Sequence, residues 1–288
     1  MPLVAALLVG ALAATFTGSA RDARPAATLI AAGDVASCQS DGDERTARLL
    51  AQLPGTVAVL GDAVYERGTD AEFRDCYHPT WGRERARTRP AVGNHEYGTP
   101  GAAGYFRYFG RAAGPSGKGW YSYELGAWHV VVLNTNCSQV GCGTRSEQYR
   151  WLRRDLVTRG RRCTLAYGHH PRFSSGLHGP EATVAPLWRL LYAHRVDVAL
   201  AGHDHHYERF APLDARGRLD RARGIRSFVV GTGGRSLYPV AFPLRGSRVR
   251  TDGTYGVLVL RLLSGRYTWR FVPVPGSRFR DGGGASCR

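Results

Sequence analysis

The chain has 288 residues, of which 43% are hydrophobic, enough for one large domain with a substantial core. No Pro- or Ser-rich linker divides it, and no repeat of the solenoid type is present. The net charge of +16 comes from 39 basic and 23 acidic residues, but the arginines are scattered, which argues against a nucleic-acid surface and favours anionic substrates.

The first residues are typical of an export signal. An apolar run reaches to about Phe16, and Gly18-Ser19-Ala20 supplies the small residues that a signal peptidase needs. The run has no Lys or Arg before it, and an uncleaved anchor is the alternative, but it is shorter than the roughly 20 residues that span a bilayer. We expect a signal peptide at 1–20 and one soluble domain at 21–288. The mature protein is expected to be secreted into an extracellular, periplasmic or cell-wall space, as a monomer that does not bind membranes.

The cysteines that follow predict disulfides. They are Cys38, Cys76, Cys137, Cys142, Cys163 and Cys287. An even number in an exported chain favours disulfides, for which fifteen pairings exist, and the absence of a CxxC spacing argues against a zinc ribbon. Cys137 and Cys142 are close enough to close a small loop, and we expect the others to pair as Cys38–Cys76 and Cys163–Cys287.

The hydrophobic pattern alternates between strands and helices along the chain. Short apolar or β-branched runs predict strands at residues 27–32, 56–61, 89–92, 120–123, 128–133, 163–167 and 196–201. Helices are predicted at residues 44–53, 101–109, 146–156 and 184–193. Antiparallel strands are expected at residues 227–230, 255–263 and 266–274, and a loose tail at 282–285. The pattern as a whole predicts a mixed α/β sheet sandwich flanked by helices.

Several of the predicted strands end in a glycine followed by a polar side chain. These side chains are Asp34, Asp62, Asn94, His169, and the pair His203 and His205, with Tyr65 three residues after Asp62. Glycine lets the backbone turn sharply, and in an extended segment both histidines of the last pair would project to the same side. Carboxylate, imidazole, amide and phenol ligands suit Fe, Zn or Mn, and this set is too large for one ion. The pattern predicts two metal ions bridged by Asp62 at the carboxyl ends of the strands.

In their order, these motifs resemble those of the calcineurin-like metallophosphoesterases, and Tyr65 brings the chain nearest to the purple acid phosphatases. The matching motifs are Gly33-Asp34, Gly61-Asp62-x-x-Tyr65, Gly93-Asn94-His95-Glu96, His169 and Gly202-His203-x-His205. Ala36 and Ala166 replace the family's usual Gly and Val, changes that affect packing and remove no ligand. The resemblance implies a four-layer α-β-β-α sandwich of two mixed sheets, in the small single-domain, tartrate-resistant form that lacks the N-terminal β-domain of the plant enzymes.

The resemblance also implies how the ligands are divided between two metal ions. One ion would be held by Asp34, Tyr65 and His205, and the other by Asn94, His169 and His203, with Asp62 bridging both. In the family the ion bound by tyrosine is Fe(III), and the second ion is Fe, Zn or Mn.

Two further histidines match catalytic residues of the family. His95 corresponds to the histidine that contacts the phosphoryl group, and His178 to a second catalytic histidine that protonates the leaving oxygen. The implied function is hydrolysis of small phosphate monoesters by attack of a metal-bound hydroxide, as in acid phosphatases. A phosphodiesterase or nucleotidase with the same metal core, and a non-catalytic binder of phosphate or nucleic acid, are the alternatives.

Other polar residues near these motifs are expected to support the site. His170, His206 and Glu208 are expected to orient the ligands, and Arg172 and Arg209 to attract anionic esters at its mouth.

Overall fold

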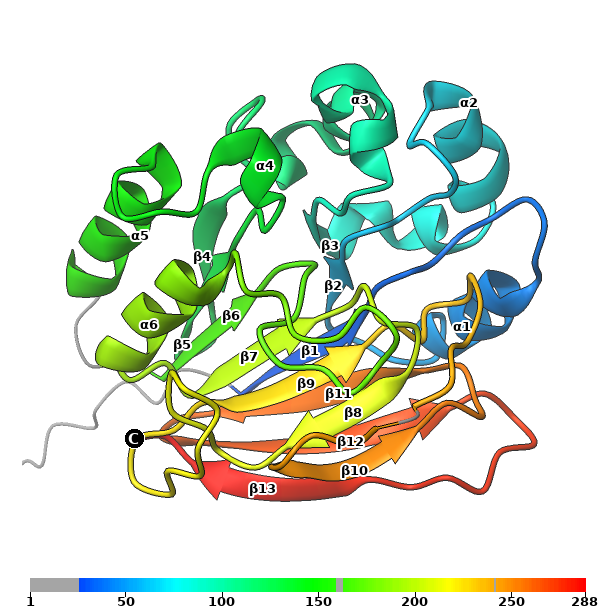
Figure 1. Ribbon diagram of the computed structural model, residues 1–288. Coiled ribbons are helices and arrows are strands. Elements are labelled where there is room, and N and C mark those ends of the chain that lie inside the picture. Colours follow the sequence, from blue (N-terminus) through cyan, green and yellow to red (C-terminus); the bar gives the residue numbers. More distant parts are fainter. Residues whose placement is uncertain (1–25, 159–162, 241) are drawn as a thin grey trace, which may run out of the picture.

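The protein is described by a computed structural model that covers residues 26–158, 163–240 and 242–288. Two mixed β-sheets pack face to face, with helices on their outer sides, which confirms the predicted sandwich (Figure 1). Within the described ranges, no helix is long and apolar enough to cross a membrane. The predicted signal peptide at 1–20 lies outside the described residues.

The first sheet has the strand order β13-β12-β11-β1-β2-β3. Strands β1, β2 and β3 run parallel, whereas β11 is antiparallel to β1, and β12 and β13 continue the antiparallel pairing outward. The strands of this sheet are β1 (Ala27–Ala32), β2 (Thr56–Leu60), β3 (Thr88–Ala91), β11 (Gly256–Leu263), β12 (Arg266–Pro273) and β13 (Gly282–Ser286).

The second sheet has the strand order β10-β8-β9-β7-β6-β5-β4. Its parallel centre is formed by β5, β6, β7 and β9, and the other strands pair antiparallel at the two sides. The strands are β4 (Tyr121–Leu125), β5 (Trp128–Val132), β6 (Thr164–Tyr167), β7 (Val198–Ala201), β8 (Tyr207–Phe210), β9 (Arg226–Val230) and β10 (Ser247–Thr251).

Short helices connect the strands and cover the sheets. The α-helices are α1 (Gly42–Leu50), α2 (Asp70–Glu72), α3 (Ala103–Phe109), α4 (Cys137–Val140), α5 (Glu147–Thr158) and α6 (Ala185–Ala193). A π-helical turn follows α2 at Phe73–Tyr77, and 3₁₀ turns occur at Trp81–Arg87, Glu96–Gly98, Pro100–Ala102 and Gly110–Ala113.

Alternation along the central strands divides the core into two layers. In β5, Val130 and Val132 are buried in the core between the sheets, whereas Val131 packs in a second core with α5 and α6. Side chains alternate with a period of two, so a strand covered on both faces is apolar throughout. This explains why the central strands appear in the sequence as continuous apolar runs.

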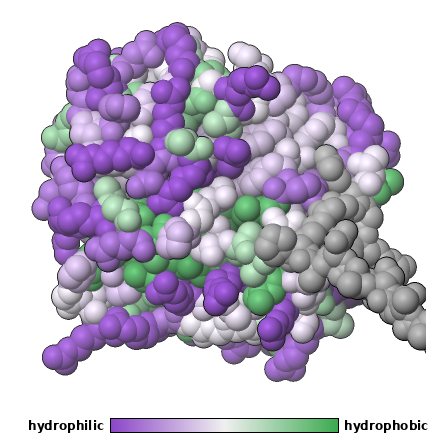
Figure 2. Space-filling view, turned by 180° about the vertical axis from the view of Figure 1, so that it is seen from behind, coloured by the Kyte–Doolittle hydropathy of each residue, from purple (hydrophilic) through white to green (hydrophobic). Residues whose placement is uncertain are grey.

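On the face seen from behind, hydrophilic side chains cover most of the surface, and hydrophobic ones are gathered in its lower half (Figure 2).

The structure corrects two predictions for the C-terminal part. Residues 227–230, expected to form an antiparallel strand, lie in β9, which is antiparallel to β8 as predicted but parallel to β7 on its other side. Residues 282–285, expected to form a loose tail, belong to the edge strand β13, which pairs with β12. Their run of glycines offers no side-chain pattern, and the strand is held by backbone pairing. The antiparallel pairing expected between residues 255–263 and 266–274 is confirmed.

The three predicted disulfides are present and leave no free cysteine among the described residues. Cys38–Cys76 ties the loop after β1 to the helical turns that follow β2. Cys137–Cys142 closes a loop with a sequence separation of only 5, around α4. Cys163–Cys287 spans a separation of 124 and fastens the end of β13 to the start of β6.

We predict that the long-range disulfide contributes most to stability. Replacing Cys163 and Cys287 by Ser should lower the free energy of unfolding by about 2–5 kcal/mol, because a bond that closes a long loop restricts the unfolded chain most. The matched control is a variant in which Ser replaces Cys137 and Cys142. Its free energy of unfolding should fall clearly less. Denaturant titration measures both losses, and thiol titration of the denatured, unreduced wild type should find no thiol. Free thiols in the native protein, or an equal loss in both variants, would contradict the prediction.

Candidate metal centre

The predicted ligand residues meet at one edge of the two sheets. The parallel strands of the first sheet deliver Asp34, Asp62 and Asn94 at their carboxyl ends, and those of the second sheet deliver His169, His203 and His205. Parallel strands place their carboxyl ends side by side, which is where α/β folds bind ligands. The structure thus collects side chains that are up to 171 positions apart in the sequence, from Asp34 to His205.

One group of ligand atoms surrounds the hydroxyl of Tyr65. This hydroxyl lies 2.9 Å from Asp34 Oδ1 and 3.1 Å from Asp62 Oδ2. His205 Nε2 lies 3.2 Å from the same hydroxyl and 3.4 Å from Asp34 Oδ1. Two carboxylates, a phenol and an imidazole therefore face a common point, and all four side chains are buried.

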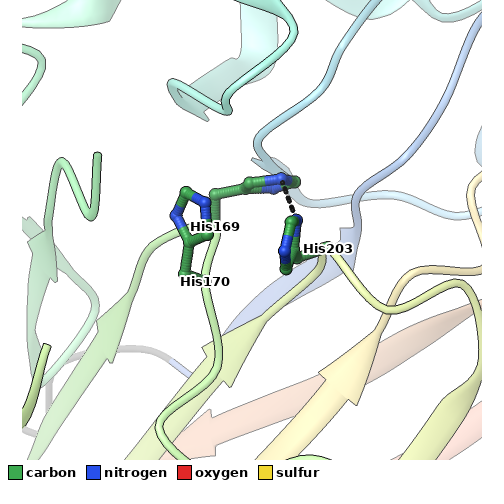
Figure 3. A group of neighbouring side chains, drawn as sticks. All are labelled: His169, His170 and His203. Carbon is green, nitrogen blue, oxygen red and sulfur yellow. Dashed lines mark hydrogen bonds between the residues drawn. The ribbon is translucent and has the colours of Figure 1, made fainter. Parts of the chain in front are cut away.

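A second group forms around His169. Its Nε2 lies 2.9 Å from Asn94 Oδ1 and 3.2 Å from Asp62 Oδ2. His203 Nδ1 points at the same nitrogen from 3.2 Å, as the dashed line in Figure 3 shows. Asp62 Oδ2 therefore lies in both groups, which is the position that a bridging ligand requires.

The orientation of the imidazole rings suits metal binding. His169 Nδ1 lies 2.9 Å from the carbonyl oxygen of Leu60, so it carries a hydrogen and leaves the lone pair of Nε2 facing inward. The inward-facing atoms of both groups lie 2.9–3.4 Å apart. Ligands about 2.0–2.2 Å from a shared ion have roughly this spacing. Two cations therefore fit the residues present.

Even without a metal ion, the buried carboxylates of this site need positive charge nearby. Burial raises the pKa of Asp62, but the neighbouring His169 outweighs it and holds the pKa below its usual range. Burial lowers the pKa of His169, but Asp62 outweighs it and raises that pKa to about 9. Burial, with the charges of Asp34 and Asp62, raises the pKa of Tyr65 well above its usual value. A bound cation would supply the charge that otherwise comes from a proton on His169.

Three of the ligand residues have a strained backbone. Asp34, Asp62 and His203 have φ values of 62°, 45° and 71°, in the left-handed region that non-glycine residues seldom adopt. The expectation that the segment of His203 and His205 is extended is therefore wrong, because it forms bends. Both histidines nevertheless reach the site, since the left-handed turn at His203 redirects the chain.

The glycines before the ligands are needed for close approach. A Cβ atom at Gly61 would lie 2.5 Å from Nδ1 of the His169 ring. A Cβ atom at Gly202 would lie 2.5 Å from Asp34 Oδ2. Each glycine therefore admits a ligand that arrives from a different strand.

Glu96 is a buried residue for which the sequence pattern predicted no role. Its carboxylate accepts hydrogen bonds from the backbone N–H groups of Asp62, Ala63, Val64 and Gly93 at 2.7–3.3 Å. Burial, together with the charge of Asp62, raises the pKa of Glu96 to about 8. By holding the loops after β2 and β3 together, Glu96 fixes the backbone of Asp62. Its place in the Gly93-Asn94-His95-Glu96 motif was the signal in the sequence.

The two predicted catalytic histidines lie at the open side of the centre. His95 packs against the ring of Tyr65 at 4.3 Å, its side chain is 31% exposed, and its Nε2 lies 4.0 Å from Asp62 Oδ2. Its Nδ1 is fixed by the Glu66 carbonyl oxygen at 2.7 Å. The ring of His178 lies 4.4 Å from that of His203 and is exposed to solvent. Both can therefore face a substrate.

The residues expected to orient the ligands divide into two sets. His170 packs at 4.5 Å from His203, and its Nδ1 lies 3.0 Å from Thr135 Oγ1 (Figure 3). His206 and Glu208 contact each other at 3.2 Å, away from the ligand atoms. Tyr238, which sequence reasoning missed, stacks on His205 with ring centroids 4.0 Å apart.

The two arginines expected at the mouth have other positions. Arg209, the third residue of β8, forms an ion pair with Asp281 at 2.7 Å. Arg172 lies over the ring of Phe173, in a pocket that it shares with residues of α6. Neither expectation is confirmed, because an arginine close to a ligand in sequence can leave the site within one turn of chain.

Comparisons with known proteins agree with this geometry. Residues 27–207 match the calcineurin-like phosphoesterase family. Purple acid phosphatase 23 of Arabidopsis thaliana is 31% identical over 200 residues, which are 56% of this chain and 43% of that protein. The chain thus covers less than half the length of this relative.

Solved structures share the fold. Purple acid phosphatase PPD1 from yellow lupin (Lupinus luteus) seeds superimposes with a TM-score of 0.73 at 17% identity, covering 91% of this chain and 54% of that one. GAP50, described as the anchor in the inner membrane complex of Plasmodium, gives a TM-score of 0.70 at 15% identity, with 91% and 89% covered. The matched family segment includes every predicted ligand and more than half of the residues, so the chain belongs to the calcineurin-like phosphoesterase family.

Proposed function

We propose that the protein is a secreted phosphatase that hydrolyses small phosphate monoesters with two metal ions, Fe(III) and a divalent Fe, Zn or Mn. The observation that supports this most directly is the pair of ligand groups that share Asp62 Oδ2. Asp34, Tyr65 and His205 would complete the site of the ferric ion, because a phenol oxygen and carboxylates suit a hard, highly charged cation. Asn94, His169 and His203 would complete the second site.

Two bound metal ions would neutralise charge on the phosphate oxygens and lower the pKa of water to about 7. The chain's own part is to orient the ester and to handle protons. With Nδ1 held by the Glu66 carbonyl, His95 directs Nε2 toward the centre, where a protonated ring can donate to a phosphoryl oxygen as negative charge develops. His178, at the exposed rim, is placed to give a proton to the leaving oxygen.

Secretion is supported by the disulfides. All six cysteines form disulfide bonds, two between distant parts of the chain and one across a small loop. Disulfide bonds form and persist in oxidising compartments. The apolar run near the start of the sequence agrees with this proposal.

The alternatives differ in what they require of the site. A phosphodiesterase or nucleotidase would use the same metal ligands. Only the substrates that it hydrolyses would distinguish it from a phosphomonoesterase. A non-catalytic binder would share the fold, as GAP50, described as an anchor, does. The complete set of ligand side chains, with His95 beside it, favours an enzyme, since binding alone does not need a proton donor at the open side. A panel of monoesters and diesters, combined with metal analysis, tests the choice.

We predict about two transition-metal ions per chain, with iron at the Tyr65 site. Asp62→Ala should lose both ions and the activity, because Asp62 contacts both ligand groups. Tyr65→Phe should abolish a phenolate-to-iron absorption band while keeping the fold. Elemental analysis and visible spectroscopy measure these changes. A colourless wild type without iron would refute the ferric assignment, and full metal content in Asp62→Ala would refute the bridge.

His95→Ala should keep both metal ions and lower kcat by about 10²–10³, as expected for removal of one donor to the transition state. His95 Nε2 lies 4.0 Å from Asp62 Oδ2, beyond hydrogen-bonding distance, so its loss should leave metal binding intact. Steady-state kinetics on p-nitrophenyl phosphate, with metal content as control, measures the effect. An unchanged kcat with both ions bound would show that His95 does not contact the reacting group.

His178→Ala should slow esters with poor leaving groups more than p-nitrophenyl phosphate, whose phenolate leaves without a proton. The comparison needs kcat on an alkyl phosphate and on p-nitrophenyl phosphate, and metal content, since the ring packs on His203. Equal slowing of both esters would make His178 a phosphate contact and not the proton donor.

A further inference from the structure

A groove lined by arginines lies at the opposite end of the second sheet from the candidate metal centre. Arg226 is the first residue of β9, and β9 runs parallel to β7, whose carboxyl end carries His203. The groove has a volume of about 520 Å³, and we call it the arginine groove after its lining arginines Arg209, Arg221, Arg226, Arg248 and Arg288. The neighbouring strands β8, β9 and β10 carry three of them, Arg221 lies in the loop between β8 and β9, and Arg288 follows β13.

The positive charge of the groove is only partly neutralised. Arg209 forms a bidentate ion pair with Asp281. Within the described ranges, Arg221, Arg226 and Arg248 form no ion pair with an acidic side chain. The Arg226 guanidinium donates a hydrogen bond to a neutral partner, the hydroxyl of Tyr267, at 3.3 Å. A concave surface with excess charge of one sign raises the local concentration of ligands of the opposite sign.

Two of the guanidinium groups are held in place before any ligand binds. Arg226 and Arg209 stack on the ring of Trp269 at 4.7 and 5.1 Å from its centroid. Stacking orients the planar fork and reduces the freedom that binding would remove. Packing on Trp269 explains why Arg209 and Arg226 lie where they do. It does not explain the positions of Arg221 and Arg248, which are exposed and line the same groove.

The ligand class follows from the shape and chemistry of the groove. Its volume lies in the range of small-ligand sites, and guanidinium forks bind phosphate oxygens in pairs. None of the described residues that line it is aromatic, so it lacks the stacking platform with which proteins bind single-stranded nucleic acid. We propose that the arginine groove binds a short oligophosphate chain, at a site independent of the metal centre.

The test is calorimetric titration of the full-length metal-loaded protein with inorganic tripolyphosphate. The groove variants are Arg226→Gln with Arg248→Gln, and Arg221→Gln with Arg248→Gln, the latter pair being exposed and remote from Trp269. Arg245→Gln with Arg250→Gln is the matched control, because both arginines are exposed near β10, outside the groove, and the same charge is removed. A repeat with His95→Ala as the background limits hydrolysis of the probe.

The groove variants should lose one tripolyphosphate site or weaken its Kd by at least about tenfold, whereas the control should change it less than about twofold. Binding should weaken as salt is raised. Turnover of p-nitrophenyl phosphate by the groove variants should match wild type. If the proposed phosphatase function fails, turnover is absent in every form, yet the difference in binding remains. Equal binding by groove variant and wild type, equal losses in variant and control, or tighter binding of single-stranded DNA than of tripolyphosphate would overturn the proposal.

Discussion

The edge where the two sheets meet is organised by the need of two buried carboxylates, Asp34 and Asp62, for positive charge. Removing a carboxylate from water is costly unless a cation or several donors compensate. The hydroxyl of Tyr65 lies within hydrogen-bonding distance of both, and His169 faces Asp62 with a pKa raised to about 9. These contacts relieve part of the cost and place neutral and anionic ligand atoms around two points. A pair of metal ions would satisfy the same oxygens more completely, which explains why the acidic, phenolic and imidazole groups are gathered so tightly.

Such a cluster can exist only if the backbone around it is held firmly. Asp34, Asp62 and His203 adopt left-handed conformations that cost free energy, of order 1–3 kcal/mol each. The last four residues of β1 and of β2, which lead to the site, are buried, and the Glu96 carboxylate binds four backbone N–H groups next to the site. The rigid sandwich therefore offsets the free-energy cost of the strained backbone, and the candidate ligands are oriented before a metal ion binds.

The convergence of the candidate ligands could be predicted from the sequence because most of them follow a strand and a glycine, a pattern that local chemistry produces. The role of Glu96 could not, since a buried carboxylate that binds backbone N–H groups resembles any acidic residue in a loop. Strand β13 was missed because Gly282, Gly283 and Gly284 have no side chains to alternate. The scattered arginines of the sequence predict no concentrated basic surface of the kind that binds nucleic acid, but the antiparallel pairing of β8 with β9 and β10 brings some of them together. Contacts of this kind depend on strand order, which the sequence pattern does not reveal.

The two ends of the second sheet therefore have different chemistry for a physical reason. Parallel strands place all their carboxyl ends at one edge, so residues there come from loops that can bend toward a common point. At the other end, β8 runs antiparallel to both of its neighbours, β9 and β10, and residues near the end of one strand lie beside residues near the start of the next. Arg209 and Arg226 meet over Trp269 in this way. Structures at 15–17% identity share the fold, so the fold alone does not fix the chemistry of either end of the sheet, which follows from the side chains placed there.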